Sequence, residues 1–374
     1  YLVRMLGLFM VLPVLPLVAP AIDGATPLLV GLAIGIYGLS QAALQIPFGF
    51  MSDRIGRKQI IAVGLGLFIS GSLVAGFADD IYMLILGRFM QGCGAIASAL
   101  LALMSDLTRV DQRSKVMSII GISIAGSFSL SLILGPLIAN ALGLAGIFFL
   151  TAVLGGLALA TLVLGIPTPE IRGVNLDASV QRGMLGMVVR DLGLWRVNVS
   201  VFTLHYLLVS LFTVLPVIFM NTSKIDMGDH SLYYLMLLLF SFIVMLPFMW
   251  LSDRVQDVRI TLTVMVSLGL AAFCIMGSFA SFWWVIAGVI LFFMSFNLLE
   301  VFLPAQLSKT AGAGTRGTAM GVYTTCQFLG IFAGGAVSGW ILSMVDISTL
   351  MYFDAGIVAI WLLICMTFPS LSAI

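Results

Sequence analysis

Charged residues are scarce in this chain. Asp, Glu, Lys and Arg make up 9% of its 374 residues, hydrophobic residues make up 61%, and the mean hydropathy is +1.18. Soluble domains carry about 25% charged residues, so this composition excludes a soluble globule. The net charge of +1 gives no indication of a nucleic-acid partner, and we expect none.

Residues that carry metal or catalytic chemistry are also few. The four cysteines, at 93, 274, 326 and 365, lie in apolar stretches without metal-ligand spacing, and we interpret them as packing residues. No CxxC, HExxH or GxxxxGK(S/T) pattern occurs, which argues against a metal site and against direct use of ATP. Because no nucleophile, base and orienting group can be assembled, we predict that the chain is not an enzyme and needs no cofactor.

Long apolar runs fill most of the sequence. About 20 apolar residues cross the 30 Å hydrocarbon layer as a helix. Gly, Pro and charged residues divide the chain into twelve such runs, at roughly 2–20, 27–50, 59–78, 81–105, 114–140, 143–166, 194–219, 231–251, 260–280, 283–307, 317–343 and 348–368. The sequence therefore predicts an all-α membrane protein with twelve transmembrane helices.

One loop occurs twice. PFGFMSDRIGRK at Pro47–Lys58 has a shorter copy, PFMWLSDRV, at Pro247–Val255, with Pro, Phe, Ser, Asp and Arg in register at an offset of 200. Duplicated helical halves are the architecture of secondary transporters. We therefore predict two pseudo-symmetric six-helix halves, 1–166 and 194–374, joined by a cytoplasmic linker over 167–193, the longest polar connection.

Basic residues predict the orientation. Of the 17 Lys and Arg residues, 14 follow even-numbered runs, at 54, 57, 58, 109, 113, 115, 172, 182, 190, 196, 254, 259, 309 and 316. The positive-inside rule places these connections, and both termini, in the cytoplasm. The opposite face is acidic, with Asp at 23, 79, 80, 226, 229 and 346.

The first copy of the loop carries the pattern Gly-x-x-x-Asp-Arg-x-Gly-Arg-Lys. Its positions are filled by Gly49, Asp53, Arg54, Gly56, Arg57 and Lys58. A glycine at 49 permits close helix approach, Gly56 permits a sharp turn, and Asp53 can face the positive N-terminus of a neighbouring helix. A tight cytoplasmic turn with anchoring charges is the simpler interpretation. The pattern resembles motif A of the major facilitator superfamily, which implies a conformational latch. Asp106 ends the fourth run on the cytoplasmic side, where we expect it to join this latch; proton carriage is the alternative.

Two weaker patterns support the resemblance. Arg88, followed by Gln91 and Gly92, resembles motif B of the proton-coupled members. Gly126 with Gly135-Pro136 resembles the antiporter motif C, but Ala139 and Asn140 stand where two glycines usually follow; a helix kink with small-residue packing is the alternative. Together the motifs resemble the drug/proton antiporter branch of the family.

Ionisable residues inside the runs are functional candidates because they are costly in a membrane. Glu300, His205, Arg88 and Arg4 are the candidates for proton coupling, and Asp354 is a further one. A carboxylate in a low-dielectric cavity has a raised proton affinity, and histidine titrates near neutral pH. A structural carboxyl and a core histidine are the alternatives.

Helical spacing also predicts walls of a substrate cavity. Side chains that share a helix face are Tyr37, Gln41 and Gln45; Phe293, Asn297 and Glu300; and Tyr323 and Gln327. Plain helix packing is the alternative for each aromatic residue.

The resemblance implies a monomeric carrier in the lipid of a bacterial inner (plasma) membrane. It would export small amphiphilic, drug-like compounds by alternating access in exchange for protons, with the proton gradient in place of a cofactor. The alternatives are a carrier of one metabolite, such as a sugar or organic ion, and a membrane sensor that does not transport.

Overall fold

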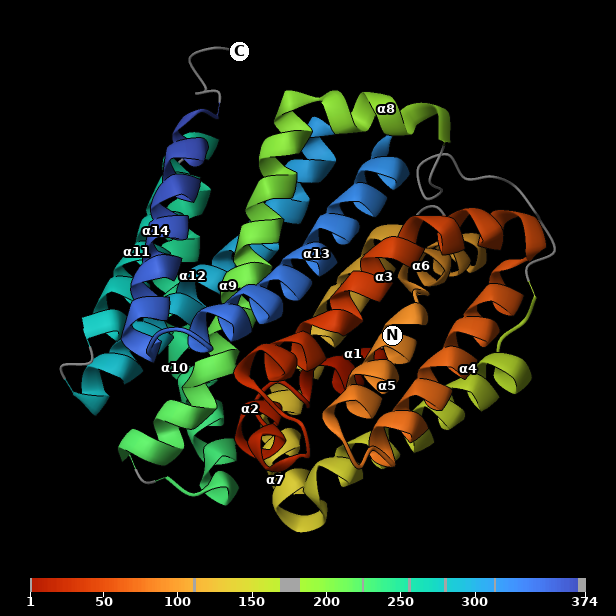
Figure 1. Cartoon of the computed structure of the whole chain (residues 1–374). Helices are drawn as coiled ribbons and strands as arrows, with labels where there is room; N and C mark the ends of the chain where they lie inside the picture. The colour runs from red at the N-terminus through yellow and green to blue at the C-terminus, as the bar shows by residue number, and fades with distance from the viewer. Residues whose placement is uncertain are drawn as a thin grey trace.

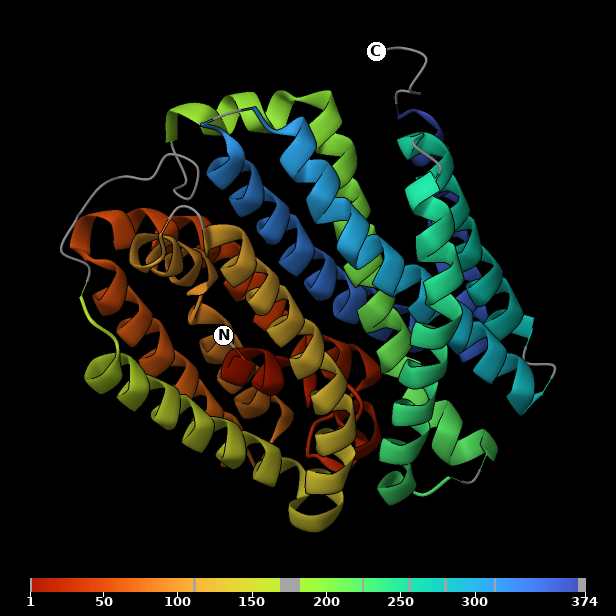
Figure 2. The same ribbon diagram turned by 180° about the vertical axis from the view of Figure 1, so that it is seen from behind.

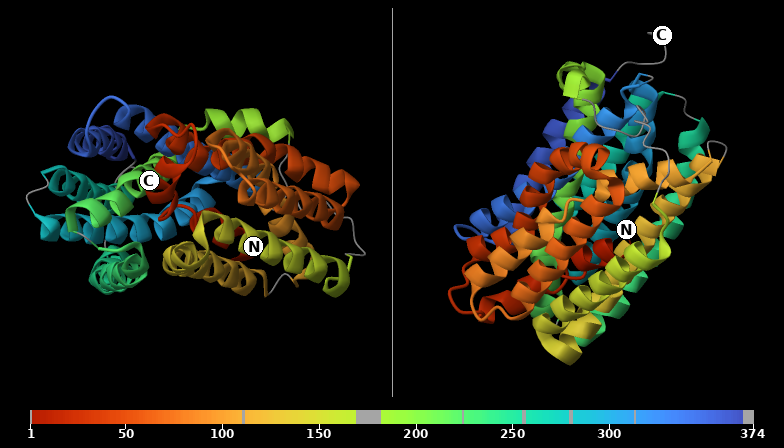
Figure 3. Two further views of the ribbon diagram at one scale, coloured as in Figure 1. Left: turned by 60° about the horizontal axis from the view of Figure 1, so that its bottom comes forward. Right: turned by 90° about the vertical axis from the view of Figure 1, so that its right-hand side faces the viewer.

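A computed structural model describes residues 2–109, 112–168, 182–223, 225–254, 257–278, 281–312 and 314–368, and these are almost entirely helical (Figure 1). In chain order the elements are α1 (Leu2–Phe9), α2 (Leu15–Val18), the 3-10 turn η1 (Ala19–Ala21), α3 (Pro27–Ile55), α4 (Arg57–Gly76), α5 (Ile81–Cys93), α6 (Ala97–Leu107), α7 (Arg113–Ala160), the π-helical turn η3 (Thr161–Gly165), α8 (Arg182–Arg190), α9 (Leu192–Ser223), α10 (Met227–Arg254), α11 (Val258–Ser278), α12 (Phe282–Thr310), α13 (Arg316–Leu342) and α14 (Ile347–Met366). The long helices run in nearly the same direction, as helices that cross one bilayer do (Figure 3).

Ten helical stretches of the described residues are long and apolar enough to cross a membrane. One of them, Ile119–Gly165, has 47 residues, which is more than twice the length needed. It bends sharply at Gly143, whose φ of 70° is left-handed (Figure 2). This single stretch therefore contains the two predicted runs 114–140 and 143–166.

The first predicted run, 2–20, is not a continuous helix. Three prolines, Pro13, Pro16 and Pro20, break it into α1, α2 and η1, because proline lacks the N–H of the helical ladder. The unwound residues Met10–Val14 are buried, and Met10 N–H donates to the Leu6 carbonyl at 2.9 Å. Irregular backbone at membrane depth is tolerated where protein covers it, as here.

Other predicted boundaries also differ from the structure. The run 81–105 is divided into α5 and α6 at Gly94, where a Cβ would lie 2.5 Å from the Gly64 carbonyl oxygen, so the chain turns at a close backbone contact. In the predicted linker, residues 169–181 lie outside the described residues. Part of the remainder forms α8, which lies across one end of the bundle (Figure 1).

Three helices begin with a side-chain cap at the end of the bundle where we predict the outer face. Thr26 accepts a hydrogen bond from Leu29 N–H, Asp80 from Met83 N–H at 2.7 Å, and Asp346 from Thr349 N–H at 2.9 Å. Hydrogen bonds from the Thr349 side chain and backbone lower the pKa of Asp346. Acidic caps also interact favourably with the positive ends of helix dipoles, which accounts for two of the aspartates on this face.

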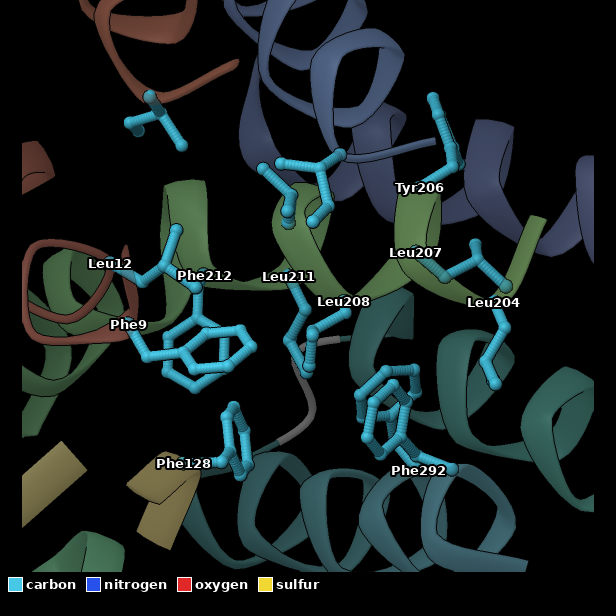
Figure 4. Close-up of a cluster of buried hydrophobic side chains, with 14 of the residues drawn as sticks. Phe9, Leu12, Phe128, Leu204, Tyr206, Leu207, Leu208, Leu211, Phe212 and Phe292 are labelled. Atoms are coloured by element: carbon cyan, nitrogen blue, oxygen red, sulfur yellow. The ribbon is translucent and has the colours of Figure 1, made fainter. Parts of the chain in front are cut away.

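Aromatic rings fill the centre of the bundle. The centroid of the Phe128 ring of α7 lies 5.0 Å from that of Phe9 in α1 and 6.4 Å from that of Phe212 in α9 (Figure 4). It also lies 6.1 Å from the ring centroid of Phe296 in α12. Such offset and edge-on pairs add about 0.5–1.5 kcal/mol each beyond the area they bury. This cluster joins helices from the beginning and the end of the chain.

Helices α3 and α13 make a close backbone contact. We call it the outer contact, because it lies toward the predicted outer face. Its glycines are Gly31, Gly35 and Gly38 of α3 and Gly335 and Gly339 of α13. A Cβ on Gly31 would lie 2.2 Å from the Gly335 carbonyl oxygen, so the two backbones touch. The glycines lie in the first half of α3, near its capped end, and small residues are what allow membrane helices to approach this closely.

Candidate functional site

A histidine, a carboxylate and an amide from three helices meet inside the bundle. His205 Nε2 of α9 lies 3.7 Å from Glu300 Oε2 of α12 and 2.7 Å from Gln327 Nε2 of α13. His205 is buried, whereas the Glu300 side chain is 35% exposed. We call the two titratable residues, together with the glutamine beside them, the titratable cluster. The sequence marked each of them, and the structure brings them together.

The hydrogen bonds of His205 define its neutral form. Its Nδ1 lies 3.1 Å from the Val201 carbonyl oxygen, which can only accept, so Nδ1 carries the proton. Nε2 then accepts from the Gln327 amide. A second proton would make Nε2 a donor, which excludes the bond from the Gln327 N–H and allows one to Glu300, 3.7 Å away. Glu300 Oε2 has no hydrogen-bond partner among the described residues, so it is available to receive that bond.

The other predicted cavity residues of α12 and α13 lie around this cluster in different ways. Tyr323 is buried, and its hydroxyl has no hydrogen-bond partner within the described ranges. Asn297 is half-buried. Phe293 is fully buried, with its ring 6.1 Å from Phe212 and 6.2 Å from Phe128, so it belongs to the aromatic cluster. A role for Phe293 in binding substrate stays a prediction.

Two arginines lie on either side of one tyrosine. Arg4 of α1 donates from Nε to the Tyr37 hydroxyl at 3.2 Å, and its guanidinium lies 5.9 Å from the ring centroid of Phe328 in α13. Arg88 of α5 lies 5.1 Å from the Tyr37 ring centroid. It donates to the Ala33 carbonyl at 3.3 Å and to Gln91 Oε1 at 2.9 Å. The structure places these two proposed coupling residues around Tyr37 rather than in the titratable cluster.

The glutamines of α3 form a short polar chain. Gln41 donates to Gln45 Oε1 at 3.0 Å, and Gln45 donates to the Ser98 hydroxyl of α6 at 2.7 Å. Both glutamines are buried, and Gln41 Oε1 has no partner among the described residues. Tyr37 and Gln41 thus place polar groups on the shared face that the sequence predicted, while Gln45 bonds to α6.

The loop after α3 is held by its arginine. Arg57 pairs with Asp53, donates to the Ser52 hydroxyl at 2.8 Å, and pairs with Asp106 at the end of α6 at 3.2 Å. Gly56, with φ 126°, makes the turn between α3 and α4, and a side chain there would be strained. The predicted association of Asp106 with this loop is therefore a direct ion pair.

The other motif positions divide between structure and surface. Lys58 donates to the carbonyls of Val163 and Ile166, at 3.2 and 2.7 Å, and so satisfies groups at the end of η3. Arg54 is exposed in the last turn of α3, where a cation suits the helix dipole, and Gly49 is buried.

The motif C residues lie in α7. A Cβ on Gly135 would lie 2.5 Å from the Met10 carbonyl oxygen, so α7 contacts the unwound segment of the first run there. Pro136 follows inside the helix. Gly126 has no atom within 4 Å of its Cβ position, so packing does not require glycine at 126.

A buried carboxylate outside the main candidates lies between α9 and α14. Asp354 is 0% exposed, and it accepts hydrogen bonds from the Tyr206 hydroxyl at 3.0 Å and the Ser210 hydroxyl at 2.5 Å. The sequence showed Asp354 inside an apolar run, but its hydroxyl partners lie about 150 residues away and could not be assigned.

Buried titratable and cationic side chains between membrane-crossing helices are typical of secondary transporters. The model of the Major Facilitator Superfamily matches residues 1–335, and the chain belongs to that family.

The chain is 40% identical over 365 residues to the inner membrane transport protein YajR of Escherichia coli, covering 97% of this chain and 80% of that protein. It is 30% identical over 141 residues to the class B tetracycline resistance protein of Escherichia coli, covering 37% of this chain and 34% of that protein. Among solved structures, the human organic anion transporter MFSD10 matches with a TM-score of 0.69 and 17% identity, over 97% of this chain and 96% of that one. The relatives are named as transporters or resistance proteins, in agreement with a carrier rather than an enzyme.

Replacing Asp53 by asparagine is expected to change conformational exchange more than ligand affinity. The substitution removes the charge at the end of α3 that pairs with Arg57 of α4, and it leaves the membrane interior unchanged. A loss of about 1.4 kcal/mol shifts a two-state ratio tenfold. Transport rate should fall several-fold at unchanged affinity, and distances between spin labels on the Arg54 end of α3 and the Arg316 end of α13 should redistribute.

Asp79→Asn is the control for Asp53, because Asp79 is an exposed aspartate at the other end of the bundle. An unmoved distance distribution in Asp53→Asn would show that this loop is a structural turn.

Proposed function

We propose that this chain exports small amphiphilic compounds across the inner membrane in exchange for protons. The titratable cluster carries the proposal: His205 and Glu300 lie 3.7 Å apart on membrane-spanning helices. An intramembrane carboxylate costs several kcal/mol when charged, so it is normally functional. The similarity of part of the chain to a tetracycline resistance protein supports efflux of drug-like compounds.

The cluster suggests how a proton changes the conformation. In the neutral form, His205 connects α9 to α13 through Gln327. A proton on Nε2 breaks that hydrogen bond and forms one to Glu300, which connects α9 to α12 instead. Since α13 is also the helix that contacts α3, proton occupancy biases the contact between the two halves.

The proposed orientation places the Lys58 end of α4 and helix α8 in the cytoplasm, together with both termini. The excess of Lys and Arg at this end supports it. The outer contact of α3 and α13 then lies toward the outer face. A structure closed at its outer contact corresponds to a state accessible from the cytoplasm in alternating access.

Proteoliposomes test the exchange directly. Compounds including tetracycline are first screened for thermal stabilisation of the purified protein, and stabilising compounds are then offered to vesicles with an acidic lumen. Proton efflux should drive several-fold accumulation over vesicles at equal pH, and a protonophore should abolish it. Accumulation that is independent of the pH gradient would exclude proton antiport.

A further inference from the structure

Both arginines near Tyr37 have N–H donors without a hydrogen-bond partner in the described part of the chain. Arg4 is 2% exposed, yet neither Nη1 nor Nη2 has a hydrogen-bond partner among the described residues. Arg88 is 0% exposed, and its Nη2 is likewise without a partner there. Within the same ranges, no acidic side chain pairs with either guanidinium. Two buried positive charges therefore lie near one tyrosine without compensation.

The two arginines differ in how firmly they are held. Arg88 is fixed by the Ala33 carbonyl and by Gln91, which in turn donates to Ser72 at 2.8 Å, so it is built into α5 and its neighbours. Arg4 has a single hydrogen bond, from Nε to the Tyr37 hydroxyl. That hydroxyl accepts from Arg4, so its own hydrogen remains available to donate. The Arg4 guanidinium thus has two donor groups, Nη1 and Nη2, near a tyrosine hydroxyl that can also donate.

The cover over Arg4 comes from the other half of the molecule. The Phe328 ring of α13 lies 5.9 Å from the Arg4 guanidinium and 6.4 Å from the Tyr37 ring. Because halves of such carriers move as rigid bodies, displacement of α13 would uncover the guanidinium. The Arg4 guanidinium thus lies beside a helix of the other half, at the boundary between the two halves.

We propose that Arg4 and Tyr37 bind the carboxylate of an amphiphilic organic anion, with Arg88 adding positive charge behind Tyr37. The planar, two-oxygen geometry of a carboxylate matches the two Nη donors of a guanidinium. The aromatic faces of Tyr37 and Phe328 suit an apolar body attached to it. The inference rests on the proposed function only in placing substrate between the halves, and it narrows the substrate class to anions.

Binding to the purified chain tests the site without any proton gradient. Benzoate, benzamide and benzylamine share one ring and differ in charge. Benzoate should raise the unfolding temperature of the wild-type protein most, and Arg4→Gln should weaken benzoate binding at least tenfold, because a charge-assisted hydrogen-bonded pair is lost. The control is Arg196→Gln, which removes an arginine in the first turns of α9 that bonds to Thr367 and stacks on Phe368; benzoate binding should be unchanged.

The stability of the ligand-free protein gives an independent readout. If Arg4 is an unpaired buried cation, Arg4→Gln should unfold at a higher temperature than wild type, since an uncompensated charge is removed. A structural arginine would give the opposite result. The proposal is overturned if Arg4→Gln is less stable without ligand, or if benzoate protects the wild type no better than benzamide. Neither measurement involves proton coupling, so failure here leaves proton exchange to be judged by the vesicle assay.

Discussion

Gly335→Ala is expected to shift the molecule toward a state that is open at the outer contact. A Cβ on Gly335 would lie 2.5 Å from the Gly31 carbonyl oxygen and 2.8 Å from Gly35 N, and both are backbone atoms of α3. Helix backbone cannot turn aside as a side chain can, so α3 and α13 must separate. Overpacking typically costs 1–3 kcal/mol, which corresponds to a change of about fivefold to about 150-fold in the population ratio.

Spin labels at Asp79 and Met344, exposed residues near the predicted outer ends of the two halves, would report this separation. Gly356→Ala is the matched control, because the Cβ position of Gly356 has no atom within 4 Å. It carries the same gain in helix propensity, about 1 kcal/mol, without the clash. Equal distance distributions in wild type and Gly335→Ala would show that the contact tolerates a methyl group and does not hold the outer end closed.

The helices were predictable because a membrane demands uninterrupted apolar length. Their order follows from the runs, whereas ten stretches of the described residues, against twelve predicted runs, are long and apolar enough to cross a membrane. Helix α7 shows why boundaries are harder to predict: two runs joined by Gly143 continue as one helical stretch with a bend. The prolines at 13, 16 and 20 were visible in the first run, but length and hydropathy alone treat it as continuous. Only tertiary cover of Met10–Val14 explains how an unwound segment is stable there.

The site was predictable one helix at a time. Periodicity placed Tyr323 with Gln327, and Asn297 with Glu300, on common faces, but the rotation of α12 against α13 is not encoded in any single helix. The contact of His205 with Glu300 and Gln327 therefore depends on the tertiary structure. The separation of Arg4 and Arg88 from that cluster also depends on the tertiary structure, since the sequence shows only that all four ionisable residues lie inside apolar runs.

Motif A shows the opposite case, in which the sequence contained most of the geometry. Its residues are close in the chain, so the pair of Asp53 in α3 and Arg57 in α4 crosses only the short turn at Gly56, and that turn was expected. Asp106 was the distant member, and its place at the cytoplasmic end of the fourth run predicted it. Local patterns predict local contacts, and contacts across the bundle require the fold.

Glu300→Gln is expected to abolish transport driven by a pH gradient while leaving ligand binding intact. Glutamine has nearly the same shape as glutamate but cannot take up or release a proton. Glu300 is partly exposed, and one of its oxygens has no hydrogen-bond partner in the described part of the chain, so its geometry favours it as the residue that exchanges the proton. Accumulation in acid-loaded vesicles should fall at least tenfold, to the level seen at equal pH.

Asp354→Asn is the matched control, because it makes the same isosteric change at a fully buried carboxylate of the carboxy-terminal helices. Both oxygens of Asp354 already accept hydrogen bonds from hydroxyls, and the residue is fully buried, so its geometry is that of a structural group. Asp354→Asn should therefore keep gradient-driven accumulation, while thermal shifts with the same compound confirm binding in both variants. If Asp354→Asn loses the pH dependence and Glu300→Gln keeps it, the coupling proton is carried between α9 and α14, and the titratable cluster only holds helices together.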